Sequence, residues 1–400
     1  RSRSNWGRLG MKCEWRKVKL QDIALELSDG LHKAPIFYPG GEYIFVNATN
    51  IENGRIVEKD PSKKTNLEEF LKYGVELTDR TSLYSIDGTI GNIAKYRGEK
   101  CLLGKGACYI TLDNSVDLDY IYYLLQSPIF NEYIHIMSTG STIKHISLKT
   151  MRNFTFQLPP IEQQKAIGSV LRSIDDKIEL NNEINENLER QAQAFYQELF
   201  IDNANPEWPQ GTVNDLGTVV GGSTPSKSKP EYYTEHGIAW ITPKDLSVNK
   251  AKFISRGEND ITELGLKNSS ATIMPEGTVL FSSRAPIGYI AIAAGKVTTN
   301  QGFKSVVPKP EIGTAFVYYF LQHNLPVIEG MASGSTFKEV SGSTMKNVPA
   351  VIPDSETLFR FNSFCASIFK QQKILEEQNQ RLAELRGSLL PKLMSGKISF

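Results

Sequence analysis

The chain has 400 residues, of which 40% are hydrophobic, 10% aromatic and 22% charged, a composition typical of a soluble globular protein of two or three domains. The formal net charge of +1 lacks the strong basic excess of a chain that binds nucleic acid by charge alone. No apolar run reaches the roughly 18 residues that a membrane span needs.

The chain's first residues and its cysteines say little about function. Residues 1–10 resemble an artificial extension, and Met11 is a plausible native start. Four cysteines, at Cys13, Cys101, Cys108 and Cys365, lack the spacing of a zinc site. Buried thiols in a reducing cytoplasm are therefore the expected state.

Short strands punctuated by turns open the chain. Tyr43 to Val46 is apolar and β-rich, and Ile51 to Val57 contains an Asn-Gly turn, so both segments are predicted as strands. A helix is predicted from Leu118 to Phe130, and a closing strand from Phe154 to Leu158. Pro159 and Pro160 end this strand and suit the start of a helix.

The same pattern returns about 194 residues later. Tyr122 to Gln126 recurs as Tyr318 to Gln322, and Gly140 to Lys144 recurs as Gly334 to Lys338. Offsets that drift by two or three residues indicate a duplicated domain with small loop changes. The second copy is predicted to hold strands at Ile238 to Ile241, Gly277 to Phe281 and Val348 to Ile352, and a helix at Ala315 to Asn324.

A heptad pattern follows each copy. In Ile161 to Phe200 the steps between apolar positions alternate between three and four, and a shift of 194 gives the same register after Pro353. Asn185 and Asn379 occupy equivalent positions, where a buried amide can fix register. The alternative is that each helix packs only on its own domain. The predicted seam residues are Ile167, Leu171, Ile174, Ile178, Asn185, Leu188, Phe195, Ile368, Leu375, Asn379, Leu382 and Leu389.

Chain order then constrains the architecture. The second helix can return only along the first, which predicts an antiparallel pair of about 40 residues, roughly 60 Å long. The expected fold class is α+β, with two repeated recognition domains separated by a long antiparallel two-helix coiled coil and related by a pseudo-two-fold axis. The predicted parts are domain 1 at 11–160, the first helix at 161–200, domain 2 at 201–354 and the second helix at 355–400.

The motifs of common enzymes are missing from the sequence. Gly104-Lys105-Gly106 lacks the spacing of a phosphate-binding loop, and no dinucleotide fingerprint, zinc-protease helix or nucleophile elbow occurs. Asp175-Asp176-Lys177 is similar to part of a nuclease motif only superficially, because it flanks the helix seam. We therefore expect a chain without catalytic or metal residues.

Taken together, these features resemble the specificity subunit of type I restriction-modification systems. The resemblance covers nearly the whole chain from Met11. It rests on Leu158 to Ile167, on Glu231-Tyr232-Tyr233 with Trp240-Ile241-Thr242, on Arg284 to Gly288 and on the ending Leu385 to Ile398.

The resemblance implies that each domain reads one half of an asymmetric bipartite DNA site, and that the two helices set the spacer and dock modification subunits. It implies two modification (methyltransferase) subunits and a restriction subunit as partners, besides double-stranded DNA. S-adenosylmethionine, ATP and magnesium would belong to those partners, and this chain would bind no cofactor.

Candidate DNA contacts are loops rich in hydroxyl groups and cations, which suit phosphate and groove contacts. A polar turn without a ligand is an equally good interpretation of the repeated Gly-Ser-Thr loops, and Arg284 could equally pair with a nearby acid. Tyr232, Tyr233 and Trp240 are expected in the core. The candidates are Ser141, Thr142, Lys144, Ser335, Thr336, Lys338, Ser223, Thr224, Ser226, Lys227, Ser283, Arg284, Asn47, Thr49 and Lys244.

Two other interpretations stay open. The chain could be a coiled-coil scaffold whose heads bind proteins or glycans, or an enzyme with an unrecognised site. DNA binding that weakens steeply with salt separates the first of these from a DNA reader. The first helix carries 4 basic and 8 acidic residues, which favours a protein-docking face over a DNA face.

Overall fold

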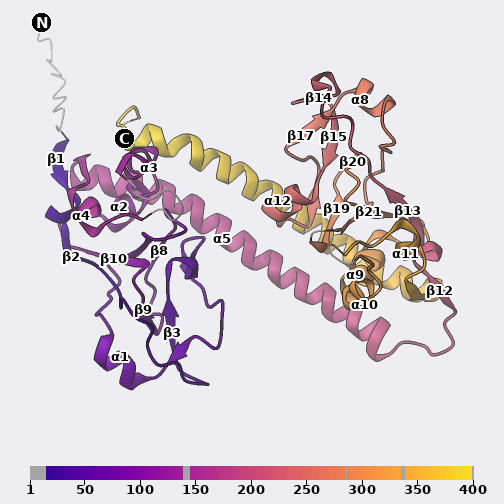
Figure 1. The fold of residues 1–400 in the computed structure, drawn as a ribbon, viewed down its shortest axis with the longest axis horizontal. Helices are drawn as coiled ribbons and strands as arrows, with labels where there is room; N and C mark the ends of the chain where they lie inside the picture. Colours follow the sequence, from indigo (N-terminus) through magenta and orange to yellow (C-terminus); the bar gives the residue numbers. More distant parts are fainter. Residues whose placement is uncertain (1–14, 138–144, 285, 335–337, 399–400) are drawn as a thin grey trace, which may run out of the picture. The chain divides into compact units, whose positions relative to one another are not determined.

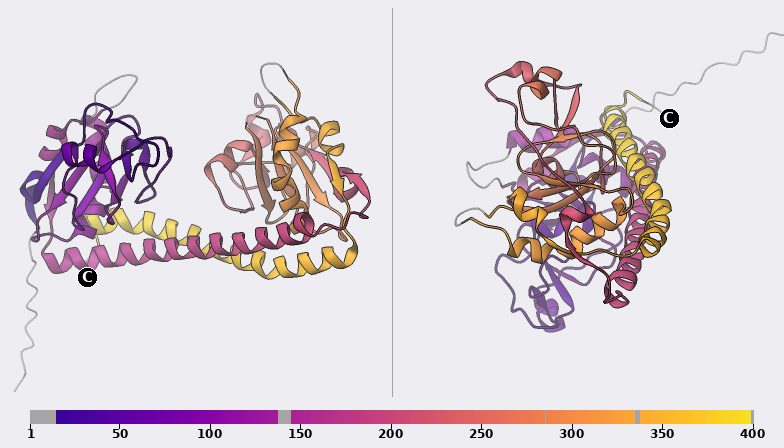
Figure 2. Two further views of the ribbon diagram at one scale, coloured as in Figure 1. Left: turned by 90° about the horizontal axis from the view of Figure 1, so that it is seen from below. Right: turned by 90° about the vertical axis from the view of Figure 1, so that its right-hand side faces the viewer.

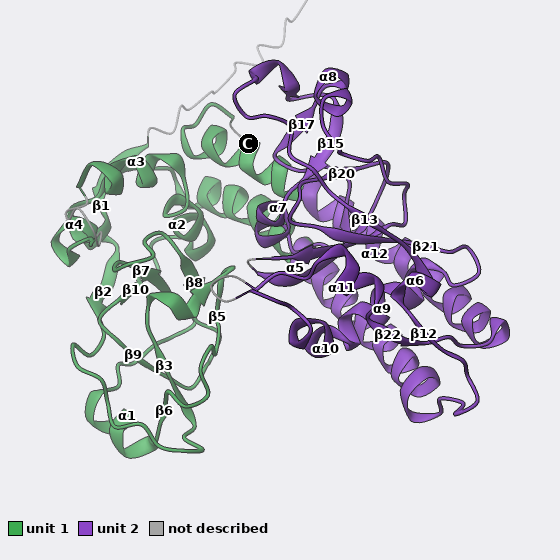
Figure 3. Ribbon diagram, turned by 45° about the vertical axis from the view of Figure 1, so that its right-hand side comes forward, with its two compact units in different colours: residues 1–177, 382–400 green, residues 178–381 purple. Residues whose placement is uncertain are grey.

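A computed structural model describes residues 15–137, 145–284, 286–334 and 338–398. The chain divides into two compact units (Figure 3). Unit 1 combines residues 1–177 with 382–400, and unit 2 consists of residues 178–381. Both long helices therefore contribute to both units. Among the described residues, no helix has the length and apolarity to cross a membrane.

The sheets of unit 1 are antiparallel except for one pair. The larger sheet has the strand order β2-β10-β7-β8, the smaller has the order β6-β3-β9, and β1 pairs with β11. Within the smaller sheet β3 and β9 run parallel. The bounds are β1 Arg16–Lys19, β2 Ala24–Asp29, β3 Tyr43–Val46, β4 Ile51–Glu52, β5 Arg55–Ile56, β6 Lys64–Thr65, β7 Thr81–Ser85, β8 Ile93–Lys95, β9 Cys101–Leu103, β10 Ala107–Leu112 and β11 Thr155–Leu158.

Unit 2 repeats the strand orders of these three sheets and adds an edge strand, β16 or β14, to each of the two larger ones. Its sheets have the orders β13-β21-β18-β19-β16 and β14-β17-β15-β20, and β12 pairs with β22. The counterpart of the parallel pair β3–β9 is β15 with β20, and the added β16 also runs parallel to β19. The bounds are β12 Gln210–Thr212, β13 Gly217–Gly221, β14 Tyr233–Thr234, β15 Ile238–Ile241, β16 Phe253–Ile254, β17 Asn259–Ile261, β18 Val279–Ser283, β19 Ile287–Ala293, β20 Thr298–Thr299, β21 Lys304–Pro308 and β22 Pro349–Val351.

Short helices complete each domain (Figure 1). In unit 1 they are α1 Leu67–Tyr73, α2 Leu118–Leu124, α3 Pro128–Met137 and α4 Leu148–Asn153, with 3-10 turns η1 Leu20–Asp22 and η2 Ala48–Asn50. In unit 2 they are α6 Val213–Leu216, α7 Pro243–Val248, α8 Glu263–Lys267, α9 Thr314–His323, α10 Leu325–Gly330 and α11 Gly342–Lys346, with the 3-10 turn η4 Pro230–Tyr232.

The prediction of one helix from Leu118 to Phe130 is wrong in one respect, because the segment forms two helices. The Ser127 hydroxyl donates to Leu124 O at 2.7 Å and closes α2. Pro128, which has no N–H to continue the first helix, then begins α3.

Two continuous long helices, α5 Ile161–Gln197 and α12 Ser355–Met394, follow the two domains (Figure 2). A π-helical turn at Glu198–Asp202 extends α5. Every predicted seam residue is buried or half-buried. The mixed α+β class, the duplication and the pair of long helices are thus confirmed.

The two helices run antiparallel in each unit taken by itself. In unit 1, Arg386 of α12 donates to Asp175 of α5 at 2.7 Å. In unit 2, later residues of α5 contact earlier residues of α12. Asn181 donates to Asn379 at 2.8 Å, and Phe195 meets Phe364 edge to face at 4.6 Å. The pseudo-two-fold relation between the domains stays a prediction.

The amide that pairs across the seam with Asn379 is that of Asn181. Asn181 is fully buried and donates to Asn379 Oδ1, while Asn379 donates to Asn182 Oδ1 at 2.7 Å. Asn185, half-buried, contributes its backbone carbonyl, which accepts from Gln372 at 3.3 Å. A buried amide pair of this kind favours one helix register over its neighbours.

A lysine lies over the repeated tyrosine pair in each unit. In unit 1, Lys95 Nζ is 4.6 Å from the ring centre of Tyr122 and pairs with Asp119. In unit 2, Lys252 Nζ is 4.9 Å from the ring centre of Tyr318 and pairs with Glu189 of α5. In unit 1 these contacts join β8 to α2, whereas in unit 2 the ion pair with Glu189 attaches the domain to α5.

The buried tyrosines predict a loss of stability at alkaline pH. Burial, reinforced by the charge of Asp175, raises the pKa of Tyr122 to about 12. In the unfolded chain tyrosine ionises near pH 10. The free energy of unfolding therefore keeps its full value below pH 10 and falls above it, where the unfolded chain loses the Tyr122 proton more readily than the folded one. At pH 11 we expect Tyr122 alone to cost unit 1 about 1.4 kcal/mol.

Urea unfolding at pH 9 and pH 11 measures this effect, with Tyr122→Phe as the comparison. The variant should lose less stability between the two pH values than the parent chain, by about 1.4 kcal/mol. Equal losses in the two proteins would contradict the assignment.

Candidate nucleic-acid interface

A pocket of about 390 Å³, lined mainly by polar residue types, lies in unit 2, where four segments meet. Three of its residues are predicted DNA contacts: Thr224 and Lys227 come from the loop after β13, and Lys244 comes from α7. The other lining residues are Trp240, Thr242, Asp245, Glu258, Asn259, Asn300 and Gln301. The fold therefore gathers hydroxyl, amide and ammonium groups in one place.

The parallel strands β15 and β20 create this site. Trp240 is paired with Thr298 and Ile241 with Thr299, so both strands end at the same edge of the sheet. The segments that leave this edge, Thr242 with α7 and the loop from Asn300, must then lie side by side. Asn300 N donates to Ile241 O at 3.0 Å and joins the two segments. The ends of parallel strands are frequent ligand sites for the same geometric reason.

Two aromatic side chains hold the loop that follows β13. Trp240, 5% exposed, donates from Nε1 to Ser223 O at 3.0 Å. Tyr233 meets Trp240 edge to face at 5.7 Å and donates to Pro225 O at 2.6 Å. The expected burial of Tyr232 and Trp240 is confirmed, whereas Tyr233 is half-exposed. These rings fix the loop that carries Thr224, Ser226 and Lys227.

The exposed groups of the pocket differ in how tightly they are held. Thr224 Oγ1 donates to Gln301 Oε1. Lys244 Nζ lies 2.6 Å from Glu258 Oε2, and this hydrogen bond and the charge of Glu258 raise the pKa of Lys244. Because both members of the pair are largely exposed, their attraction is weak, and Lys244 can exchange Glu258 for a phosphate. Ser226 is exposed and shares a hydrogen bond with Ser228 at 2.9 Å.

A second group of predicted residues adjoins the pocket. Lys304 Nζ donates to Gln301 O at 3.3 Å and lies 3.5 Å from Glu339. Glu339 in turn forms a β-bridge with Arg284, which is half-buried. Lys338 is exposed. Arg284 and Lys338 therefore belong to the same surface as Gln301.

Ser283 belongs to the core of unit 2 and is excluded from this surface. Its side chain is fully buried, and its hydroxyl donates to Gly302 O at 3.1 Å. All five residues of β18 are buried, so the predicted DNA contact at Ser283 has no surface that a ligand could touch.

Unit 1 builds the corresponding surface from β3 and β9. Val46 is paired with Leu103, and the loop Gly104-Lys105-Gly106 follows β9 beside Asn47. A Cβ on Gly104 would lie 2.2 Å from Asn47 Oδ1, so a larger residue there would displace the Asn47 side chain. Asn47 is half-buried, whereas Thr49 and Lys105 are exposed. The two predicted contacts thus adjoin a cation that the sequence pattern did not identify.

The remaining candidates, Ser141, Thr142, Lys144, Ser335 and Thr336, lie outside the described residues. Sequence reasoning also missed Asn300, Gln301, Lys304 and Lys105. A signal for three of them was available, because the repeat places Gly104-Lys105-Gly106 against Asn300-Gln301-Gly302.

The buried thiols Cys101, Cys108 and Cys365 are confirmed as free, and burial raises the pKa of each. Such thiols pack as small apolar side chains and are poor nucleophiles. In the described part of the chain no three side chains of histidine, cysteine, aspartate or glutamate gather as metal ligands would.

The fold and the site define a duplicated recognition domain carried on long helices. The family model for the type I restriction modification DNA specificity domain matches residues 12–190 and again residues 205–385. The chain therefore belongs to the family of type I restriction-modification specificity proteins.

Individual relatives agree with this assignment. The type I restriction enzyme MjaIX specificity subunit of Methanocaldococcus jannaschii is 40% identical over 191 residues, which cover 46% of this chain and 44% of that protein. The HindI specificity subunit of Haemophilus influenzae is 22% identical and covers 96% of this chain and 100% of its own length.

A solved structure shares the fold over nearly the full length. The S subunit of a type I restriction-modification system from M. genitalium superposes with a TM-score of 0.61 at 17% identity. The match covers 97% of this chain and 98% of that one.

Proposed function

We propose that this chain is the sequence-specific DNA-recognition subunit of a type I restriction-modification complex. Each repeat would read one half of an asymmetric bipartite site. The observation that carries the proposal is that both units build a polar surface at the ends of a parallel strand pair, yet place different side chains on it. The shared fold would position both domains on DNA in the same way, and the different side chains would let each domain recognise a different half-site.

Two residues that are paired by a backbone β-bridge near this surface illustrate the difference in each unit. In unit 1, Asp87 forms a β-bridge with His145, and Asp87 Oδ1 lies 4.0 Å from His145 Nδ1. In unit 2, Arg284 forms the corresponding bridge with Glu339. The acidic residue and its basic partner have exchanged places between the two bridged segments, so the two surfaces offer donors and acceptors in a different order.

Partners would supply what this chain lacks. A net charge of +1 is low for a protein that binds DNA unaided, so modification subunits would contribute much of the phosphate contact. We propose two modification (methyltransferase) subunits and a restriction subunit. S-adenosylmethionine, ATP and magnesium would act on those subunits, with no catalytic step on this chain. The cytoplasm, which holds both DNA and reduced thiols, would be its location.

The long helices would set the spacer and dock the modification subunits. They expose large apolar side chains, notably Leu180, Phe359 and Ile374, which the helices of a protein that functions alone would bury. Exposed acids accompany them on α5, among them Glu183 and Glu186. Apolar groups surrounded by charges are typical of a protein interface.

Reversal of two of these charges tests the docking role. Glu183→Lys combined with Glu186→Lys should weaken binding to purified modification subunits about tenfold at low salt, with a smaller effect at high salt. The control is Glu263→Lys on α8, an exposed acid of the globular domain, which should not change docking. Unchanged docking together with weaker DNA binding would assign α5 to the DNA instead.

The function itself is tested by a methylation map of the host genome with and without the gene for this chain. Loss of one bipartite motif supports the proposal, and an unchanged map refutes it. Binding measured against salt separates the alternative, a scaffold with protein- or glycan-binding heads, because a DNA reader loses affinity steeply as salt rises.

A further inference from the structure

The two units hold one exposed polar side chain at the same backbone position. Leu103 ends β9 and Thr299 ends β20, and Lys105 and Gln301 each lie two residues further on. The next residue confirms the equivalence: Gly106 O accepts from Ile86 N at 3.1 Å, and Gly302 O accepts from Ser283 N at 2.8 Å. Lys105 and Gln301 therefore occupy equivalent positions in the two repeats.

Backbone hydrogen bonds fix both positions. Lys105 N donates to Leu31 O at 3.0 Å, and Ala107 N donates to Gly104 O at 3.0 Å. In unit 2, Gly302 N donates to Asn300 Oδ1 at 2.8 Å, and Phe303, which is fully buried, anchors the loop. A long side chain on a rigid loop loses little backbone entropy when it binds.

The surroundings of Gln301 orient its amide. Thr224 Oγ1 donates to Oε1, which leaves that oxygen a second lone pair. No described residue accepts a hydrogen bond from Gln301 Nε2. The amide thus presents an acceptor and a donor side by side, the pattern that adenine N6 and N7 require.

Lys105 presents a different pattern. Its side chain is exposed, and among the described parts of the chain no carboxylate forms an ion pair with it. An ammonium group donates but cannot accept, which matches the two acceptors O6 and N7 of guanine.

We propose that Lys105 and Gln301 are base-reading residues at one shared position of the two repeats, with Gln301 selecting adenine in one half-site and Lys105 selecting guanine in the other. This inference rests on the proposed DNA-recognition function and names the residues that differentiate the half-sites. Thr224 would act as a positioning residue for the Gln301 amide.

Reciprocal substitutions test the proposal in the complete complex with its partner subunits. Gln301→Lys should change one adenine of the methylated motif to guanine, and Lys105→Gln should make the opposite change in the other half-site. Gln301→Ala should relax that position, reducing discrimination roughly tenfold. Methylation maps and binding to duplex libraries randomised at one position measure both effects.

The control substitutions are Gln210→Lys and Lys267→Gln, which make the same charge changes at exposed positions elsewhere in unit 2 and should leave the motif unaltered. An unchanged motif in Gln301→Lys and Gln301→Ala would overturn the proposal, as would an equal loss of affinity for every base. If Gln301→Lys does not assemble, the Ala variant decides. Failure of the function itself would appear differently, as a parent complex that methylates no motif.

Discussion

Replacement of Lys252 by methionine should lower the free energy of unfolding of unit 2 by about 3–5 kcal/mol. Lys252 is buried, yet its Nζ donates to Tyr319 Oη at 3.0 Å and to Gln372 Oε1 at 2.9 Å, and pairs with Glu189. Removal of the ammonium group leaves the Glu189 carboxylate, only 22% exposed, without its cation. An uncompensated charge in such a place costs far more than the lost attraction.

The rings around Lys252 add to this effect. Its Nζ lies 4.5 Å from the ring centre of Phe369 and 5.2 Å from that of Tyr319. Desolvation lowers the pKa of Lys252, and the charge of Glu189 opposes that shift. The buried ammonium group is stable because carboxylate, amide and aromatic groups take the place of the water molecules that would hydrate it at the surface.

Urea unfolding followed by tryptophan fluorescence measures the loss, since Trp208 and Trp240 both belong to unit 2. Lys250→Met is the matched control: Lys250 is exposed and lies 4.8 Å from the ring centre of Tyr289. This control should cost no more than about 1 kcal/mol. Adding Glu189→Gln to Lys252→Met should restore part of the stability. Equal losses for the two lysine variants would show that the burial of Lys252 carries no special energy.

The parts of the fold that local patterns determine could be predicted from sequence. Apolar, β-rich runs predicted β3, β15 and the closing strands, and Pro159 and Pro353 marked the ends of the closing strands. The heptads identified both long helices, because a seam repeats every 3.5 residues whatever lies beside it. The repeat itself predicted that the second domain would copy the topology of the first.

Features that depend on contacts distant in sequence escaped prediction. Ala251-Lys252-Phe253 looks like an ordinary exposed strand end, and its burial depends on partners far away in sequence, such as Glu189 and Gln372, 63 and 120 residues away. The candidate site was missed in part for the same reason. The position of Gln301 follows from the parallel pairing of β15 with β20, and parallel pairing leaves no mark in either short strand.

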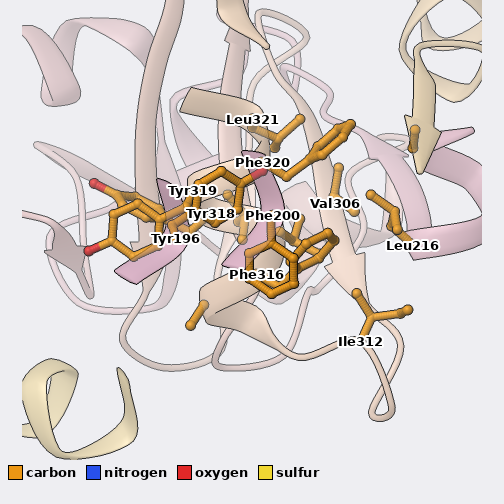
Figure 4. Close-up of a cluster of buried hydrophobic side chains, with 14 of the residues drawn as sticks. Tyr196, Phe200, Leu216, Val306, Ile312, Phe316, Tyr318, Tyr319, Phe320 and Leu321 are labelled. Atoms are coloured by element: carbon orange, nitrogen blue, oxygen red, sulfur yellow. The ribbon is translucent and has the colours of Figure 1, made fainter. Parts of the chain in front are cut away.

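Replacement of Phe361 by alanine should also destabilise unit 2 by about 3–5 kcal/mol. Phe361 of α12 is fully buried, and its ring meets Phe200 edge to face at 5.1 Å and Tyr196 at 5.8 Å. It joins the aromatic cluster in which Tyr196, Phe200 and Phe316 pack together (Figure 4). The truncation removes buried apolar surface and leaves a cavity that rigid neighbouring rings cannot fill.

Phe359, two residues earlier on the same helix, provides the control. Its side chain is 75% exposed, so Phe359→Ala should change the free energy of unfolding by less than about 0.5 kcal/mol. Docking should depend on Phe359 although stability does not: the Phe359 variant should bind modification subunits more weakly than the parent chain, with an unchanged free energy of unfolding. A Phe361 variant as stable as the Phe359 variant would contradict the packing argument. A Phe359 variant that docks normally would remove this residue from the proposed interface while leaving the stability prediction intact.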